Sequence, residues 1–285
     1  MSVKTKYVDL LTDISFKRVF GVDQNRDLLI AFLNEVFKGR KRIIDLVFNK
    51  NEHHGNNKEE GSAIFDLLCT GDKGERFLIE VQTGMPTNFK KRALFYTSRL
   101  ISEQAPKGGM KDWAYNITEV YFLGILEESI TTDLRYFHDI GLCYRDTCEI
   151  FYDGFGHIFI ELSKFVKTIE ELNPNSDLEN WLYAFKHIRE MNDMPAQLQQ
   201  NVIFEKLYTI AEYSNMTKEE QKIYEKELKQ KWDNAAVKKQ KFLEGEEYGE
   251  EKKAREIALE MKKDGVALDI IIKYTKLSIE EINAL

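Results

Sequence analysis

The stretch AIFDLLCTGDKGERFLIEVQT, residues 63–83, decides the fold of this sequence. Two runs of apolar, β-prone residues flank the polar segment Asp72-Lys73-Gly74, which is a pattern typical of a β-hairpin. A three-residue loop of this composition forms a type I turn that ends with Gly74 in the left-handed region. We therefore expect two antiparallel strands joined by this loop.

The loop length determines which side chains meet across the hairpin. With the three-residue loop, Asp66 lies directly opposite Glu80, and Ile64 lies opposite Gln82. Directly opposed side chains share a face of the sheet, with Cβ atoms about 5 Å apart. A two-residue loop, Asp72-Lys73, is the alternative, and it would place the two carboxylates on opposite faces. We expect the three-residue loop.

Asp66 and Glu80 are unusual residues for β-strands. Acidic side chains are depleted in strands and are rarely buried unless they are paired or bind a metal. Two carboxylates at so short a separation raise each other's pKa unless a cation lies between them. Oxygen donors favour Mg²⁺, Mn²⁺ or Ca²⁺ over zinc. The hairpin therefore predicts a site for one of these divalent cations.

The composition limits the class of protein. With 285 residues, of which 43% are hydrophobic, the chain is long enough for a main domain and an appendage. It has no run of about eighteen apolar residues and no apolar signal core, so we expect no membrane partner. Cys69, Cys143 and Cys148 form neither a CxxC pair nor an even set, which favours free thiols and a cytoplasmic location.

The formal net charge of −7 by itself argues against a nucleic-acid partner. The charge is uneven, however, because residues 1–126 are mildly basic and the remainder is acidic. This distribution is compatible with a DNA-binding core that carries an acidic tail. Two basic clusters would contact phosphates independently of DNA sequence, or would simply be solvated surface: Arg40, Lys41 and Arg42, and Lys90, Lys91 and Arg92.

The elements around the hairpin follow an α/β order. Residues 13–20 form a helix on which Asp13 and Lys17 lie four residues apart on one face, as in a surface ion pair. Residues 120–126, VYFLGIL, are typical of a buried central strand. Further helices are expected at 23–37 and 87–104, and strands at 43–48, 148–152 and 158–162, the last two separated by a turn at Gly154 and Gly156. The order predicts an α/β core with a mixed central sheet flanked by helices.

Helices dominate the C-terminal part, so we divide the chain into a core domain, 1–165, and an α-helical C-terminal region, 166–285. Helices are expected at 173–191, 197–213 and 217–263, the last interrupted at Gly245 and Gly249. Residues 254–285 have the rhythm of a helix-turn-helix but no basic recognition face, and Ser278 and Glu281 form a capping box. Such helix pairs more often pack or dimerise than read DNA, which leaves a homodimer through the C-terminal helices open.

Several of these segments together resemble one family, the recombination-promoting nucleases and transposases of PD-(D/E)xK type, which are common in bacteria. The resemblance rests on TDISFKRVFG (12–21), LLIAFLNEVF (28–37), FDLLCT (65–70), FLIEVQ (77–82), KRALFYTSRL (91–100) and the tail AREIALEMKKDGVALDIIIKYTKLSIEEI (254–282). It spans nearly the whole chain. It implies a core similar to that of restriction endonucleases.

The resemblance also implies roles for individual residues. Asp66 and Glu80 match the two acidic positions of the motif, and Gln82 stands where its lysine usually lies. Asp13 and Lys17 match the acidic residue and the lysine of the family's DxxFK pattern on the first helix. The sequence departs from the pattern at Phe65, where a proline usually precedes the first acidic residue, and without the lysine another group must orient or activate water.

The family implies a metal-dependent DNA endonuclease that hydrolyses phosphodiester bonds, in recombination or mobile-element processes. Asp66, Glu80 and the carbonyl of Val81 would hold Mg²⁺, or Mn²⁺ or Ca²⁺, with Asp13 bound through water. Arg92 or Lys17 would stabilise the phosphate. The alternative is a catalytically inactive DNA- or protein-binding member of the same fold. Gln82 in place of lysine and the negative net charge of the chain are compatible with lost activity. A third class is an oligomeric scaffold built on the C-terminal helices.

Overall fold

The computed structural model describes residues 5–49, 52–53, 63–64, 66–84, 87–106 and 113–285, so Phe65 lies outside the described residues. The chain divides into two compact units, Met1–Lys229 and Gln230–Leu285. The first unit contains the sheet and the helices that cover it. The second contains most of the longest helix and a small helical cap.

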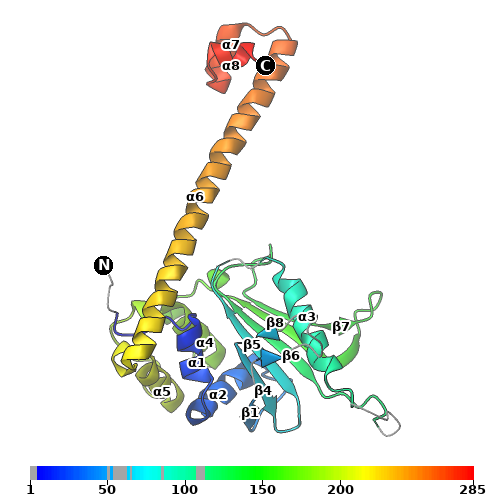
Figure 1. The fold of residues 1–285 in the computed structure, drawn as a ribbon, viewed down its shortest axis with the longest axis vertical. Coiled ribbons are helices and arrows are strands. Elements are labelled where there is room, and N and C mark those ends of the chain that lie inside the picture. Colours follow the sequence, from blue (N-terminus) through cyan, green and yellow to red (C-terminus); the bar gives the residue numbers. More distant parts are fainter. Residues whose placement is uncertain (1–4, 50–51, 54–62, 65, 85–86, 107–112) are drawn as a thin grey trace. The chain divides into compact units, whose positions relative to one another are not determined.

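A mixed six-stranded sheet forms the centre of the first unit, which confirms the predicted α/β core (Figure 1). The strands lie in the order β1-β4-β5-β6-β8-β7. Strand β5 is antiparallel to β4 and parallel to β6, β8 is parallel to β6, and the two edge strands are antiparallel to their neighbours. The strands are β1 (Leu46–Phe48), β4 (Leu67–Gly71), β5 (Arg76–Gln82), β6 (Val120–Leu126), β7 (Phe137–Cys143) and β8 (Ile150–Glu161).

The hairpin β4–β5 has the predicted three-residue loop. The amide of Gly71 donates to the carbonyl of Glu75 at 2.8 Å, and Gly74 has a φ of 86°. Leu67 pairs with Ile79, so the predicted register is confirmed from Thr70 back to Leu67, the residue that follows Asp66. The predicted pairing of Ile64 with Gln82 is wrong, because Ile64 pairs with Glu52 in a separate two-stranded sheet of β2 (Glu52–His53) and β3 (Ala63–Ile64).

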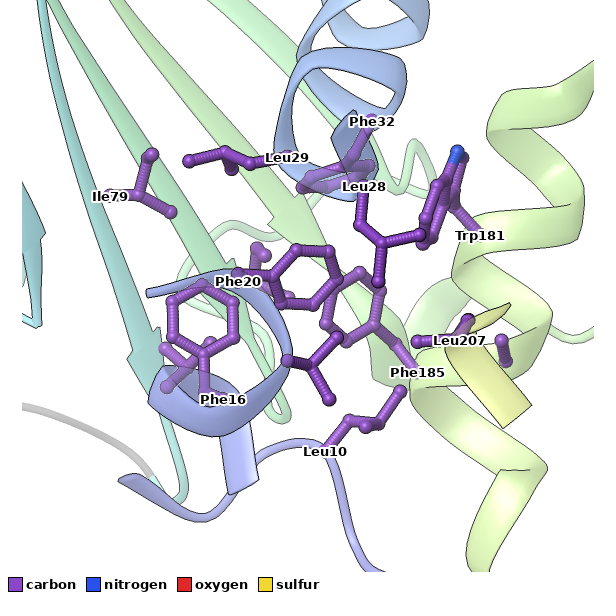
Figure 2. Close-up of a cluster of buried hydrophobic side chains, with 14 of the residues drawn as sticks. Leu10, Phe16, Phe20, Leu28, Leu29, Phe32, Ile79, Trp181, Phe185 and Leu207 are labelled. Atoms are coloured by element: carbon purple, nitrogen blue, oxygen red, sulfur yellow. The ribbon is translucent and has the colours of Figure 1, made fainter. Parts of the chain in front are cut away.

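Helices cover the two faces of the large sheet unequally (Figure 1). Helix α3 (Phe89–Ser102) packs on one face with a small apolar cluster that includes Leu78, Phe89 and Phe122. The other face carries the large core, built by α1 (Asp13–Phe20), α2 (Arg26–Val36), α4 (Asp177–His187) and α5 (Val202–Ala211). Figure 2 shows the aromatic centre of this core, where rings of Phe20, Phe32, Trp181 and Phe185 pack with centroids 5.3 to 6.0 Å apart.

Alternation along β5 assigns its side chains to these two faces. Phe77, Ile79 and Val81 enter the large core, while Leu78 enters the cluster under α3. Because successive side chains of a strand point to opposite faces, Glu80 and Gln82 lie on the α3 side with Leu78. The neighbouring strand β6 is buried along its whole length, as its apolar sequence predicts.

Two predicted interruptions do not occur. Strand β8 runs through Gly154 and Gly156 without a turn, and the chain reverses instead at residues 144–149. A Cβ on Gly154 would collide with the Tyr152 ring, so this glycine serves packing. Helix α6 (Lys218–Lys263) continues through Gly245 and Gly249.

Helix α1 has the predicted bounds, 13–20, whereas α4 and α5 are shorter than the helices predicted at 173–191 and 197–213. Thr12 caps α1 by accepting a hydrogen bond from Ser15, and Gly21 follows the helix. Helix α7 (Leu268–Thr275) and α8 (Ile279–Asn283) follow α6, and the predicted capping box of Ser278 and Glu281 is confirmed. Short 3₁₀ segments lie at Asp23–Asn25, Leu162–Lys164, Ile169–Glu171, Ile188–Glu190 and Tyr213–Asn215.

Candidate active site

Strand β5 places Glu80 and Gln82 near the carboxyl end of the strand, beside the parallel strand β6. Glu80 is 5% exposed and lies in register with Gly124 of β6. A side chain at Gly124 would collide with the ring of Phe89, the first residue of α3. The missing side chain therefore lets α3 approach the sheet next to Glu80.

Asp66 comes directly before β4 and is tied to β5 by its side chain. Its Oδ2 accepts a hydrogen bond from the amide of Val81 at 2.8 Å. Val81 lies between Glu80 and Gln82, so this bond holds the Asp66 carboxyl beside both residues. The three-residue loop makes this possible, since a shift of one residue would turn Asp66 away.

Arg92, on the first turns of α3, joins the two polar residues of β5. Its Nη2 donates to Oε2 of Glu80 at 3.0 Å and also donates to Oε1 of Gln82. The guanidinium lies 5.0 Å from the centre of the Phe89 ring. Arg92 therefore fixes the orientation of a buried carboxylate and of the amide next to it.

Asp13 and Lys17 approach Asp66 from α1. Lys17 pairs with Asp13 at 2.7 Å, so the predicted ion pair forms. Both residues act on the pKa of Asp66, which Asp13 raises and Lys17 lowers. Glu227 of α6 reaches the start of the same helix, where its Oε2 accepts from the amide of Ile14 at 3.1 Å.

Both central carboxyls titrate far above their ordinary range. Burial raises the pKa of Asp66 to about 6, against the hydrogen bond from Val81. Burial also raises the pKa of Glu80 to about 7; Arg92 opposes this rise and Asp66 adds to it. The nearby positive charges therefore compensate only part of the cost of burying two carboxylates.

The donor set of this site fits a divalent cation that prefers oxygen ligands. Asp66 and Glu80 offer carboxylate oxygens, and burial raises the pKa values of both carboxyls more than the nearby cations lower them. No group of three or more His, Cys, Asp or Glu residues suited to a metal occurs in the part of the chain that the structure describes. Further ligands would therefore come from a backbone carbonyl, such as that of Val81, or from water.

The predicted basic residues lie in different places. Arg40 pairs with Asp139 at 2.5 Å and with Asp153 at 3.3 Å, and Lys41 pairs with Glu119. These partners adjoin the end of the sheet where β5 and β6 begin, whereas Glu80 lies near the end where they finish. Arg42, Lys90 and Lys91 are exposed, and the last two lie on the turn of α3 that carries Arg92.

Sequence reasoning missed two neighbours of this site, Tyr96 and Glu227. Tyr96 lies four residues after Arg92, one helical turn along α3, and its pKa is raised by burial and by Glu80. The spacing from Arg92 was a signal that could have identified Tyr96. Glu227 carried no such signal, because only the packing of a distant helix brings it to α1.

The comparisons with known proteins give one match. Residues 10–241 match the model of a family described as PD-(D/E)XK nuclease family transposase. Neither the curated proteins nor the solved structures include a significant match to this chain. Among the described residues, no helix combines the length and apolar character required to cross a membrane.

Proposed function

The chain belongs to the PD-(D/E)XK nuclease family transposases, and from this premise we propose that it is a divalent-metal-dependent DNA endonuclease. It would hydrolyse phosphodiester bonds in recombination or mobile-element processes. The observation that carries the proposal is the pair of carboxyls, buried Glu80 and half-buried Asp66, held next to Gln82 and Arg92 near the carboxyl end of β5. The family expected from the sequence is confirmed by the match over residues 10–241.

Asp66 and Glu80, with the carbonyl of Val81, would hold the cation, and Asp13 would contact it through water. When bound, a divalent ion such as Mg²⁺ or Mn²⁺ lowers the pKa of water and neutralises charge on the phosphate. Val81 supports this role because its amide already holds the Asp66 carboxyl at 2.8 Å. Binding of the ion would favour the ionised form of both carboxyls, whose pKa values are raised mainly by burial.

Gln82 and Arg92 have different tasks. Gln82 cannot act as a general base, but its amide can position water or a phosphate oxygen. Arg92 orients Gln82 by donating to its oxygen, and Lys17 or Arg92 would stabilise the phosphate. Lys90 and Lys91 are exposed on the same helix and would contact the DNA backbone independently of its sequence. Arg40 and Lys41 are left out of this arrangement, because carboxylates of the chain already pair with them.

One observation favours the alternative function, a catalytically inactive DNA- or protein-binding member of the same fold. Arg92 donates to both Glu80 and Gln82, which puts a side-chain cation where a metal would otherwise neutralise Glu80. A permanent ion pair of this kind would stabilise the fold without metal. The binding function would then depend on the basic surface of α3.

Cleavage of supercoiled plasmid with Mg²⁺, Mn²⁺ or Ca²⁺ distinguishes the two functions. We expect the wild-type protein to cut, and Asp66→Asn and Glu80→Gln to lose more than about 100-fold of the rate. Asp153→Asn is the matched control, since it removes a carboxylate that pairs with Arg40 away from the site. Cutting that survives both substitutions would contradict the site. Salt-dependent DNA binding by a wild-type protein that does not cut would establish the inactive alternative.

A further inference from the structure

Helix α6 contains a long segment that nothing in the described chain covers. Every residue from 232 to 253 is exposed, a stretch of about 33 Å of helix. It carries large apolar side chains, and Phe242 and Leu243 are 64% and 53% exposed. In proteins, most of the stability of a helix comes from packing of one of its faces rather than from helix propensity. We therefore expect another protein surface to cover the apolar side chains of this segment.

The small residues of this segment gather around Phe242. Ala235 lies seven residues before Phe242, and Gly245 and Gly249 lie three and seven residues after it, so all share one face. A Cβ on either glycine would meet nothing within 4 Å. Glycine inside a helix destabilises it relative to alanine, and no described neighbour requires it here. Close approach of a second helix would give these glycines a function.

Charge divides the segment into two halves at Phe242. Lysines precede it, namely Lys229, Lys231, Lys238, Lys239 and Lys241, with Asp233 as the one acidic residue among them. Glutamates follow it, namely Glu244, Glu246, Glu247, Glu250 and Glu251, and two lysines, Lys252 and Lys253, end the segment. Residues 243–253 therefore carry a net charge of −3, against +3 for residues 231–241. The charge pattern of this segment is therefore complementary to that of a second copy that lies antiparallel to it.

We propose that two copies of this chain pair antiparallel through residues 231–253 of α6, with the two-fold axis at Phe242. The two Phe242 side chains would then meet, Ala235 of one copy would face Gly249 of the other, and Lys238 would face Glu246. A parallel pair would set lysines against lysines and glutamates against glutamates, which is unfavourable. The antiparallel pair is isologous and closes with two copies.

A nucleic acid fits this surface less well than a second copy. The lysine half would attract phosphates, but the adjoining glutamate half would repel them over a similar length of helix. A second copy satisfies both halves at once and also covers Phe242. The inference rests on α6 alone and is independent of the proposed nuclease function.

The mass of the full chain in solution, measured by light scattering or sedimentation, tests the proposal. We expect twice the mass of one chain for the wild type. Glu246→Lys with Glu250→Lys, both on the Phe242 face, should weaken the dimer at least about tenfold. Adding Lys238→Glu and Lys239→Glu should restore it, because the two halves are then complementary again. Only the antiparallel arrangement predicts this rescue.

Two further variants control the interpretation. Glu244→Lys with Glu247→Lys makes the same charge change on the opposite face of the helix and should leave most of the dimer intact. Gly249→Ala should raise helix content, measured by circular dichroism, and yet weaken the dimer, because the added methyl group separates the helices. A monomeric wild type, or a dimer that none of the charge reversals affects, would overturn the proposal.

Discussion

Glu80 is buried and Asp66 is half-buried, and the charge of both carboxyls depends on what surrounds them. Glu80 is 5% exposed, and the single charge of Arg92 does not bring its pKa back to the ordinary range. Near neutral pH, when no further cation is present, Glu80 therefore keeps its proton in part of the molecules, whereas Asp66, with a pKa of about 6, is mostly ionised. Both protonation and metal binding act on the same pair, so they should compete.

The raised pKa of Glu80 predicts how the stability of the metal-free protein changes with pH. Because the pKa of Glu80 is raised to about 7, its contribution to stability is fully present below its unfolded pKa and is lost as the pH rises through 7. From pH 5 to 8, the free energy of unfolding of metal-free wild-type protein should fall by roughly 1–3 kcal/mol more than that of Glu80→Gln. Urea unfolding at several pH values measures this. Equal slopes in the two proteins would contradict it.

Arg92 provides a second prediction at the residue scale. Its positive charge lowers the pKa of Glu80, so Arg92→Gln should raise that pKa further. We expect the acidic limb of the pH–rate profile of cleavage to move up by about one pH unit. Arg92→Lys retains the charge and should move the limb less. A profile that keeps its position in Arg92→Gln would show that Arg92 acts only by packing on Phe89.

Among the elements, the β4–β5 hairpin depends most on its local sequence, because one glycine in the turn determines the pairing register of the two strands. Gly74 has a φ of 86°, where a side chain is strained, and an added Cβ would lie 3.4 Å from Cγ2 of Thr118. Gly74→Ala should destabilise the protein by roughly 1–2 kcal/mol. Denaturant unfolding measures this, with Gly141→Ala as the control because an added Cβ there meets nothing within 4 Å. An equal loss of stability in both variants would contradict the conclusion that Gly74 determines the register of the hairpin.

Features that depend on residues close together in the sequence are the ones that the sequence predicts. The register of the hairpin followed from the turn residues, and the buried central position of β6 followed from its apolar run, residues 120–126. Predictions at Gly154 and Gly245 failed for different reasons. Gly154 leaves room for the Tyr152 ring and lies within β8, where the pairing with β7 shifts register instead of forming a turn. Gly245 lies within a helix, since glycine there weakens the helix but does not break it.

Contacts between segments that are far apart in the sequence could not be predicted from local sequence patterns. Arg40 belongs to a basic cluster in the sequence, but its carboxylate partners Asp139 and Asp153 come from strands about a hundred residues later. Glu227 reaches the start of α1 although more than two hundred residues separate it from Ile14. The motif residues Asp66 and Glu80, and the charged residues Asp13, Lys17 and Arg92 that act on their pKa values, could be identified from the sequence, whereas the contact of Glu227 with α1 could not.

At the scale of the whole molecule, the first unit includes the beginning of α6. Tyr224 and Leu228 of this helix are buried in the large core, and the hydroxyl of Tyr224 accepts a hydrogen bond from the amide of Asp9 at 3.0 Å. Glu227, between them, holds the amide of Ile14. The three contacts connect α6 to the segment that carries Asp13 and Lys17.

This connection predicts where the chain can be shortened. A chain ending at Lys229 keeps Tyr224, Glu227 and Leu228, so it should unfold cooperatively with nearly wild-type stability and retain any cleavage activity. A chain ending at residue 217 loses these residues and should be less stable by about 3 kcal/mol or more, because it exposes the core that they cover. Thermal and denaturant unfolding of the two chains tests this. If the shorter chain matched the longer one, the start of α6 would be dispensable for the first unit, and Asp13 would need no support from Glu227.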